Sequence, residues 1–314
     1  MKDIKKVSVV TPFFNEEDSV DYFYHAMVDV FMRVPQIDFE VICIDDGSND
    51  NTLNNLLRIH KKDARFKIIE FSRNFGKEAA LTAGIDAANG SAVIPIDADL
   101  QDPPELIIAM IAEWTKGAEV VLAKRMDRSS DSFLKQKTAK LFYSYNNRLS
   151  TISIPENVGD FRLMDRAVVD VLKTLKEQNR FMKGLFAWVG FKTITLDYAR
   201  RPRRSGATKF SGWKLWNFAI EGITSFSTLP LKLWSYLGAL MAVISFIYGG
   251  YIMVKTLYLG VQVPGYASVL VAVLFLGSLQ LFGLGILGEY LGRMFIETKN
   301  RPLYVVRKKY GGEN

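Results

Sequence analysis

The residues best suited to chemistry in this chain form a short acidic turn, Asp97-Ala98-Asp99-Leu100-Gln101-Asp102. The turn follows the apolar run Ala92 to Ile96, which predicts a buried strand, and precedes Pro103-Pro104-Glu105, where a helix can begin. Two carboxylates one residue apart can face a single hard cation, and oxygen ligands suit Mg²⁺ or Mn²⁺ that bridges to substrate phosphates. An isolated Asp-x-Asp is more often a solvated turn, so the metal interpretation depends on the rest of the chain.

Strands and helices alternate through the first 124 residues. Short apolar, β-branched runs at 7–11, 39–44, 66–70, 92–96 and 119–123 are separated by helical patterns near 17–33, 51–62, 77–88 and 104–116. This rhythm predicts βαβ units and an α/β fold with a parallel, twisted sheet. No Gly-x-Gly-x-x-Gly follows the first strand and no Walker A motif occurs, so the two commonest nucleotide cradles are absent.

Each of these strands ends in polar residues, at 11–17, 45–50, 72–77, the acidic turn and 124–125. Any one of them could be a turn or a helix cap, but five in succession favour a ligand site, because parallel strand ends meet in one crevice. The acidic pair Asp45 and Asp46 can hydrogen-bond a base and a ribose, and a cation can hold a diphosphate. Arg73, Lys77 and Arg125 can offset phosphate charge.

Two long runs without a charged side chain follow, Leu233 to Val254 and Thr256 to Gly288. Each can cross the hydrocarbon layer, which takes about 20 residues per helix. Gly260, Pro264 and Gly265 break the pattern between them, so we predict a hairpin of two transmembrane helices at about 231–255 and 266–290. Basic residues cluster before the first run and after the second, while only Lys255 marks the turn, which predicts that both termini are cytoplasmic.

The overall charge and the cysteine content agree with a membrane-bound protein of a reducing compartment. The formal net charge of +7 suits an anionic partner, either nucleic acid or the face of a membrane, and composition alone does not choose between them. Together with the two apolar runs, it leads us to expect a lipid bilayer and no nucleic acid. Aromatic and basic residues at helical spacing predict interfacial helices at 133–149 and 211–228. The single cysteine, Cys43, leaves no disulfide framework.

Several segments together resemble the inverting family 2 glycosyltransferases of the dolichyl-phosphate-mannose synthase branch. They are Val9 to Glu17, Asp45 to Ser48, Ser72 to Glu78 and Asp97 to Pro103. Later segments are similar to bactoprenol glucosyltransferases, namely Asn157 to Met164, Phe181 to Gly184, Gly212 to Asn217 and Gly288 to Arg293. The resemblance covers nearly the whole chain and implies a GT-A fold, a nucleotide-sugar donor and undecaprenyl phosphate as acceptor.

The resemblance also implies roles for individual residues. The family's base-binding acid falls on Asp46, its metal-contacting turn on Asp97 and Asp99 with Gln101 close by, and its acid before Phe-Arg on Asp160. Its basic loop falls on Arg204 to Lys209, although the arginines at 200, 201 and 203 leave open which one meets the acceptor phosphate. The catalytic candidates are Asp97, Asp99, Asp160 and Arg204, and the metal candidates are Asp99, Asp97 and Gln101. The donor-binding candidates are Pro12, Asn15, Glu16, Asp46, Ser72, Asn74, Lys77, Asp97, Gln101, Arg125 and Lys209.

The chemistry leaves the role of Asp160 open. Cleavage of a sugar-phosphate bond builds negative charge on the departing nucleotide diphosphate, which a cation held by Asp99 can stabilise. The acceptor is a phosphate monoester with a second pKa near 6, so it is mostly dianionic at neutral pH and needs little deprotonation. Asp160 is therefore either a general base or a positioning residue.

We expect an inverting, Mg²⁺- or Mn²⁺-dependent transfer of glucose from UDP-glucose to undecaprenyl phosphate at the cytoplasmic face of a bacterial inner membrane. The expected parts are a GT-A domain at 1–208, a juxtamembrane amphipathic helix at 209–230, the hairpin at 231–292 and a basic cytoplasmic tail at 293–314. Alternatives are another donor sugar, such as aminoarabinose or mannose, another polyprenyl acceptor, or a non-catalytic scaffold, which has no need for clustered carboxylates. Small residues in the second run, including Gly283 and Gly288, permit homo-oligomerisation.

Overall fold

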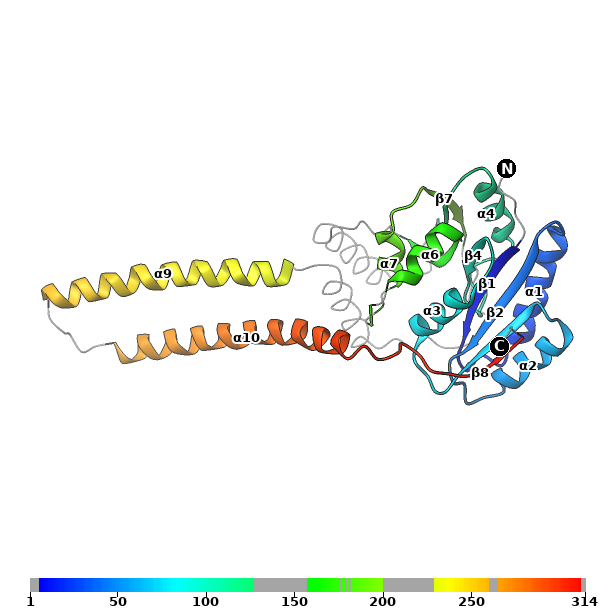
Figure 1. Cartoon of the computed structure of the whole chain (residues 1–314). Helices are drawn as coiled ribbons and strands as arrows, with labels where there is room; N and C mark the ends of the chain where they lie inside the picture. Colours follow the sequence, from blue (N-terminus) through cyan, green and yellow to red (C-terminus); the bar gives the residue numbers. More distant parts are fainter. Residues whose placement is uncertain are drawn as a thin grey trace.

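The computed structural model describes residues 6–126, 157–175, 177–178, 180, 182–199, 229–259 and 265–311. The predicted interfacial helices at 133–149 and 211–228 lie outside the described residues, as do Arg204 and Lys209. An α/β domain and a long helical hairpin make up the described part of the chain (Figure 1).

The α/β domain contains eight strands and six helices among the described residues. The strands are β1 (Lys6–Phe13), β2 (Asp38–Asp45), β3 (Phe66–Phe71), β4 (Ala92–Pro95), β5 (Val120–Arg125), β6 (Val158–Asp165), β7 (Thr193–Tyr198) and β8 (Val306–Tyr310). The helices are α1 (Val20–Arg33), α2 (Thr52–Lys62), α3 (Lys77–Ala87), α4 (Leu106–Thr115), α6 (Arg166–Thr174) and α7 (Met182–Trp188). Every strand and helix predicted before residue 124 is present, so the predicted α/β architecture is confirmed.

All eight strands form one mixed sheet in the order β7-β5-β6-β4-β1-β2-β3-β8. Strands β4, β1, β2 and β3 are parallel neighbours. The parallel arrangement predicted for the strands before residue 124 is therefore confirmed, and two strands from later in the chain make the sheet mixed, since β6 runs antiparallel between β4 and β5 and β8 runs antiparallel along β3. Strand β5 still points the same way as β4, so its carboxyl end remains at the same edge of the sheet.

Helices cover both faces of the sheet. One core cluster joins α1, α2 and α4 to alternate residues of the strands, with Trp114 and Phe23 among its buried side chains. The other cluster joins α3, α6 and α7 to the opposite face. Val41 and Cys43 therefore face one layer while Ile42 and Ile44 face the other, which explains why the central strands are continuous apolar runs.

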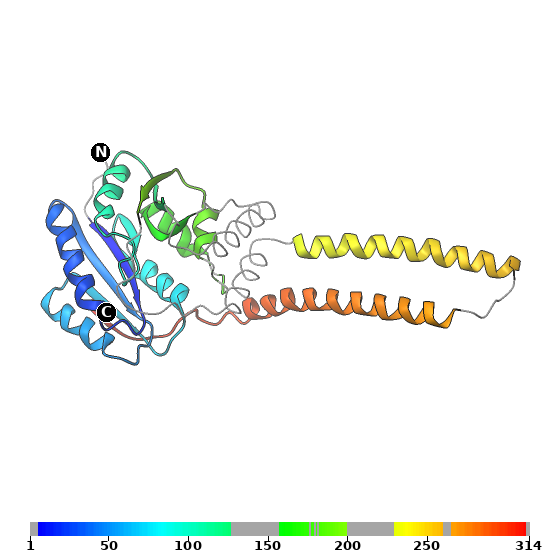
Figure 2. The same cartoon turned by 180° about the vertical axis from the view of Figure 1, so that it is seen from behind.

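Helices α9 (Leu229–Leu259) and α10 (Tyr266–Thr298) form an antiparallel hairpin that projects from the α/β domain (Figure 2). Trp234 of α9 contacts α10, with its ring centroid 5.4 Å from that of Phe282. Gly283 permits this approach, since a Cβ there would lie 1.9 Å from the indole nitrogen of Trp234. Both helices extend past the limits predicted for the spans, which were residues 255 and 290.

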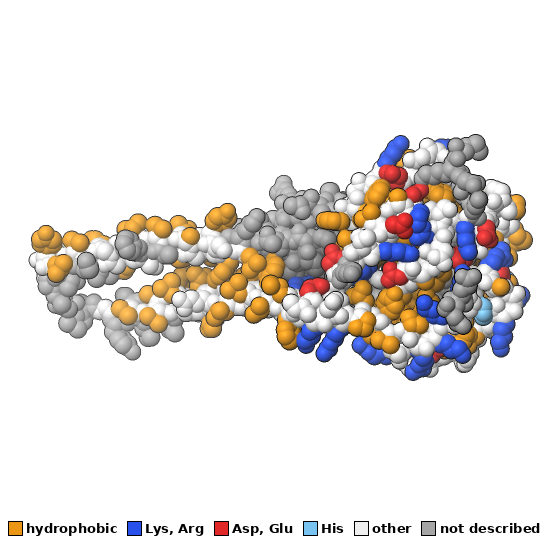
Figure 3. Space-filling model, in the orientation of Figure 1, with side chains coloured by type: hydrophobic (Ala, Val, Ile, Leu, Met, Phe, Trp, Pro, Cys, Tyr) orange, Lys and Arg blue, Asp and Glu red, His pale blue; other side chains and the backbone are white. Residues whose placement is uncertain are grey.

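The surface of the hairpin is apolar. Leu240, Tyr258 and Leu284 are among many large hydrophobic side chains that are more than half exposed, and Figure 3 shows hydrophobic atoms along both helices while charged groups gather on the α/β domain. Contiguous exposed apolar surface of this extent marks a membrane or protein interaction site. Within the described residues, one helical stretch, Phe275–Thr298, is long and apolar enough to cross a membrane by length and composition.

The close packing of α3 on the sheet gives a first prediction. A Cβ on Gly84 would lie 2.2 Å from Val10 Cγ1 and 2.7 Å from Ile44 Cδ1, so Gly84→Ala forces α3 away from β1 and β2. We expect the free energy of unfolding of the solubilised protein to fall by about 1–3 kcal/mol, measured by chemical denaturation. Lys61→Ala, on the exposed side of α2, is the control and should change it by less than about 0.5 kcal/mol. Equal stability of the two variants would contradict this packing.

Candidate active site

The acidic turn lies at the carboxyl end of β4, as the sequence predicts. The backbone N–H of Leu100 donates to the carbonyl of Asp97 at 3.2 Å, and that of Gln101 donates to Asp99 Oδ1 at 3.3 Å. Leu100 adopts a positive φ of 46°, which closes the turn tightly. The turn therefore holds Asp97 and Asp99 half-buried at the edge of the sheet.

Lys77 joins two of the predicted carboxylates. Its ammonium lies 2.7 Å from Asp97 Oδ1 and 2.8 Å from Asp160 Oδ2. Lys77 is the first residue of α3, Asp97 follows β4, and Asp160 lies on β6. Two carboxylates from separate segments therefore contact the same lysine ammonium group. The Lys77 side chain is 43 % exposed and that of Asp160 only 12 %, so this cluster reaches solvent on the side of the lysine.

The charges around Asp160 keep it ionised. Burial by itself would raise the pKa of Asp160, but the positive charges of Lys77, Lys183 and Arg162 outweigh it and lower this pKa to about 2. Oδ1 of Asp160 is buried and has no hydrogen-bond partner within the described part of the chain. A carboxylate with so low a pKa is a weak base at neutral pH and a strong partner for a cation.

Asp46 organises the loop after β3. Its Oδ1 accepts a hydrogen bond from the backbone N–H of Phe75 at 2.7 Å, and its Oδ2 accepts one from that of Gly76 at 2.9 Å. Gly47, at φ 69°, is required beside it, because a Cβ there would lie 2.5 Å from the backbone carbon of Arg73. The strand ends after β2 and β3 are therefore in direct backbone contact. Residues 72–76, which include the predicted donor-site residues Ser72 and Asn74, are called the donor loop below.

The strand end after β1 is fastened to the strand end after β2. Asn15, at φ 52°, receives a hydrogen bond at its side-chain oxygen from the backbone N–H of Asn49 at 2.9 Å, and its own N–H donates to Ser48 Oγ at 3.0 Å. The N–H of Glu16 donates to Thr52 Oγ1 at 2.9 Å. Pro12 pairs with Ile44 in the sheet. These predicted donor-binding residues thus share one edge with Asp46.

Arg125, at the end of β5, lies beside the last residue of the acidic turn. Its Nη2 is 3.7 Å from Asp102 Oδ1, and its Nε donates to the hydroxyl of Tyr198 at 3.2 Å. The Tyr198 hydroxyl in turn donates to Asp102. The structure therefore brings Arg125 to the crevice but pairs its guanidinium with protein groups.

The sequence reasoning assigned no role to three further residues of the crevice, which are Tyr198, Lys183 and Glu78. Tyr198 ends β7, a strand whose weak alternating pattern was not predicted. Lys183 lies in the segment Phe181 to Gly184, which contributes to the family resemblance but indicates no role for the lysine. Glu78 follows Lys77 and accepts a hydrogen bond from the backbone N–H of Met182 at 3.3 Å, which places α7 against the start of α3.

The donor set of the acidic turn fits a hard divalent cation. Mg²⁺ in proteins is commonly held by one or two carboxylates together with substrate phosphates, and Asp97, Asp99 and the amide oxygen of Gln101 supply oxygen ligands only. No group of three or more His, Cys, Asp or Glu side chains is arranged for a metal within the described residues, so a cation here would depend on the substrate for further ligands.

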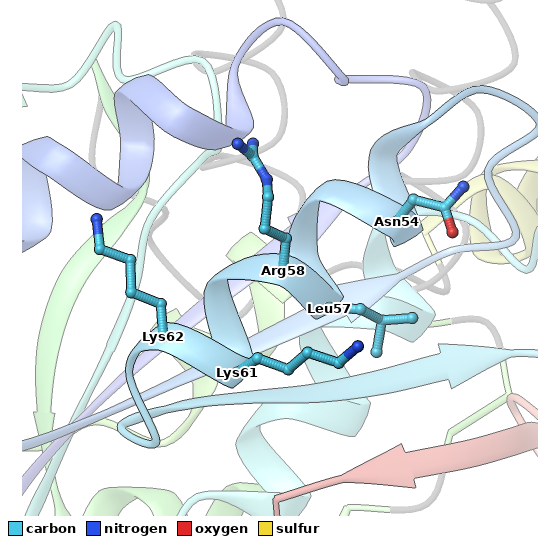
Figure 4. Close-up of a pocket in the computed structure, with 5 residues that line it drawn as sticks. All are labelled: Asn54, Leu57, Arg58, Lys61 and Lys62. Carbon is cyan, nitrogen blue, oxygen red and sulfur yellow. The ribbon is translucent and has the colours of Figure 1, made fainter.

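A separate hollow lies on the outer side of α2 (Figure 4). Five residues of this one helix line it, namely Asn54, Leu57, Arg58, Lys61 and Lys62. None of the predicted site residues belongs to it. The crevice at the strand ends is therefore the candidate active site.

An α/β sheet that carries carboxylates and a lysine at its strand ends is the arrangement of an enzyme that binds its ligand at this edge. A family model described as "Glycosyl transferase family 2" matches residues 8–172, which is more than half of the chain. The chain belongs to glycosyl transferase family 2. A second model, described as "GtrB C-terminal hairpin", matches residues 229–294 and coincides with α9 and most of α10.

Relatives resemble the chain over nearly its full length. It is 52% identical over 307 residues to the SfII prophage-derived bactoprenol glucosyl transferase of Shigella flexneri, covering 98% of this chain and 99% of that protein. It is 51% identical over 308 residues to an uncharacterized glycosyltransferase of Synechocystis sp., covering 98% of this chain and 96% of that protein. It is 50% identical over 303 residues to the prophage bactoprenol glucosyl transferase homolog of Escherichia coli K12, covering 96% of this chain and 99% of that protein.

The environment of Glu78 gives a prediction about pH. Burial, followed by the negative charge of Asp160, raises the pKa of Glu78 from 4.5 to about 7. The folded chain therefore keeps a proton that the unfolded chain releases above about pH 4.5, so this group lowers stability as the pH rises toward 7. Glu78→Gln mimics the protonated side chain. We expect its melting temperature to exceed that of the wild type by a margin that grows between pH 5 and pH 8, and a margin independent of pH would contradict the raised pKa.

Proposed function

We propose that this chain transfers glucose from UDP-glucose to undecaprenyl phosphate, with inversion at the sugar, at the cytoplasmic face of a bacterial inner membrane. The observation that carries the proposal is the 52% identity over nearly the full length to a bactoprenol glucosyl transferase, hairpin included. The carboxylates and the lysine that gather at the strand ends support catalysis rather than a scaffold role, because clusters of interacting charged groups are typical of functional sites.

The donor nucleotide is proposed to lie along the edge formed by β1, β2 and β3. Asp46 is buried, and its carboxylate oxygens already accept two backbone N–H groups, yet each oxygen can accept a second hydrogen bond from a base. Asn15, Ser72 and Asn74 supply polar groups on the rim of the same edge. Lys77 provides a fixed positive charge toward which a diphosphate can be oriented.

The residues that would hold a divalent cation are Asp97, Asp99 and Gln101. Mg²⁺ or Mn²⁺ bound there would supply electrostatic stabilisation for the negative charge that develops on the departing UDP. The chain's own contribution is to hold both carboxylates in place. Lys77 does this for Asp97 through an ion pair, and the backbone N–H of Gln101 does it for Asp99 through a hydrogen bond.

For Asp160 we propose a positioning role rather than that of a general base. Its support is the pKa of about 2, together with the ion pair to Lys77 at 2.8 Å. The acceptor phosphate is mostly dianionic at neutral pH and has little need of a base. Asp160 would fix the lysine ammonium between the acidic turn and the incoming phosphate.

The acceptor's polyprenyl chain requires the crevice to work beside a membrane. We propose that α9 and α10 both span it, with the α/β domain and both termini in the cytoplasm and with Arg204 or Lys209 meeting the acceptor phosphate. The exposed apolar surface of the hairpin and the lysines and arginines on both sides of it in the sequence support this topology. Assembly of several copies through α10 stays a prediction.

The decisive experiment measures which sugar enters the lipid fraction. Membranes containing the protein are incubated with undecaprenyl phosphate and each of several radiolabelled donors, including UDP-glucose, a mannose donor and an aminoarabinose donor. We expect label in the organic phase only with UDP-glucose, since recognition of a sugar's hydroxyls discriminates strongly between epimers. Label from another donor alone would replace glucose by that sugar, and no label from any donor would refute transfer to this lipid.

Removal of the proposed metal ligand should stop the reaction without unfolding the protein. Asp99→Asn keeps the size of the side chain but removes its charge, and we expect turnover to fall by about 100-fold or more, because charge on the leaving UDP is no longer offset. Chelator should have the same effect on the wild type, with recovery on addition of Mg²⁺ or Mn²⁺. Asp170→Asn, an exposed carboxylate on α6, is the matched control and should retain full turnover. Activity of Asp99→Asn near that of the control would contradict the assignment.

A further inference from the structure

The chain that leaves the hairpin returns to the edge of the catalytic sheet. After α10 ends at Thr298, residues 299–303 lead to Tyr304, and β8 then pairs antiparallel with β3, with Ile68 opposite Tyr310 and Phe71 opposite Val306 (Figure 1). The two matched family models cover residues 8–172 and 229–294, so neither includes this segment. The sequence had suggested only a basic tail.

Tyr304 fastens the returning segment to two elements of the α/β domain. Its ring is stacked on that of Phe71, with centroids 5.1 Å apart and planes inclined by 10°. Its hydroxyl donates to Asp86 Oδ2 at 3.0 Å, near the end of α3. Tyr304 therefore contacts the last residue of β3 and the helix that begins with Lys77.

Buried Glu70 fastens the strand that follows. It accepts hydrogen bonds from Arg307 Nη1 at 3.2 Å and from the Tyr310 hydroxyl at 2.9 Å. Glu70 lies on β3, one residue before Phe71, and is only 7% exposed. A carboxylate buried this far is held in place by these partners, so the strand is attached by side chains as well as by its backbone.

The same segment contacts the donor loop directly. The backbone N–H of Ser72, the first residue of that loop, donates to the carbonyl of Val305 at 3.0 Å. At the other end of the loop, Asp46 accepts the N–H groups of Phe75 and Gly76. The donor loop is therefore held at its start by the C-terminal segment and at its end by Asp46, the residue after β2, and Lys77 follows immediately.

We propose that residues 304–310 are a positioning strap for the donor loop, and that Tyr304 is its main anchoring residue. That the loop serves a nucleotide sugar rests on the function proposed above. A loop held at both ends loses less conformational freedom when it binds a ligand, so the strap increases donor affinity. It also keeps Lys77 in register with Asp97 and Asp160.

The strap links the site to the membrane hairpin. Only residues 299–303 separate α10 from Tyr304, and five extended residues span at most about 18 Å. Glu297, in the last turn of α10, also accepts a hydrogen bond from the backbone N–H of Gln178 at 2.9 Å, beside the segment that leads into α7. Only a short segment of chain therefore connects the donor loop to the helical hairpin.

The experiment compares Tyr304→Ala with the wild type in the full-length, detergent-solubilised protein. Hydrogen exchange of the Ser72, Phe75 and Gly76 amides should become about three- to tenfold faster, the loss expected from removing one stacked aromatic contact. The dissociation constant for UDP, by calorimetry, and the KM for UDP-glucose should rise by a similar factor. The KM for undecaprenyl phosphate should stay within about twofold.

Two further variants separate a positioning role from general destabilisation. Tyr304→Phe keeps the stacked ring and loses only the bond to Asp86, so it should recover most of the donor affinity. Lys61→Ala, exposed on α2 and outside the strap, should match the wild type throughout. Faster exchange across the whole sheet, unchanged exchange in the donor loop, or an equal rise in both KM values would overturn the strap. If exchange quickens only in the loop while the wild type does not use UDP-glucose, the strap stands and the proposed function fails.

Discussion

The site depends on one positive charge, that of Lys77, which forms ion pairs with both Asp97 and Asp160. Asp97 follows β4 and Asp160 lies on β6, and without a cation between them their like charges would repel each other. With Lys77 in place, the pKa of Asp160 is lowered to about 2, so this largely buried carboxylate stays ionised. The rest of the α/β domain can be understood as the support that holds this lysine.

That support comes from several directions. Gly84 lets α3 lie close against β1 and β2, and Asp46 fixes the loop immediately before α3 through two backbone hydrogen bonds. Strand β6 enters the sheet antiparallel between β4 and β5, which places Asp160 beside the acidic turn rather than on a distant edge. The C-terminal strand β8 then covers the open edge of β3, so the donor loop is held from its outer side as well.

In the proposed reaction, the helical hairpin and the strand-end site act together. A polyprenyl acceptor presents its phosphate at the bilayer surface, whereas a nucleotide sugar arrives from water, so the site must face both phases. The apolar surface of α9 and α10 suits contact with lipid, and the polar strand ends suit contact with a ligand that arrives from water. The short connection from α10 to β8 means that the anchor and the donor edge share a chain segment rather than a flexible linker.

The sequence by itself determined the strands from β1 to β5, the helices between them and the acidic turn, because these depend on local apolar periodicity and on turn residues next to one another in the chain. It did not reveal β6, β7 or β8, since β6 carries Asp160 and Arg162 within it, β7 is half exposed and β8 is largely basic. Only the tertiary structure decided that Lys77 neutralises Asp160, that Tyr198 and Arg125 pair with Asp102, and that the tail returns to β3. Those contacts join residues far apart in the chain, and their energies depend on distance and burial, which no local pattern encodes.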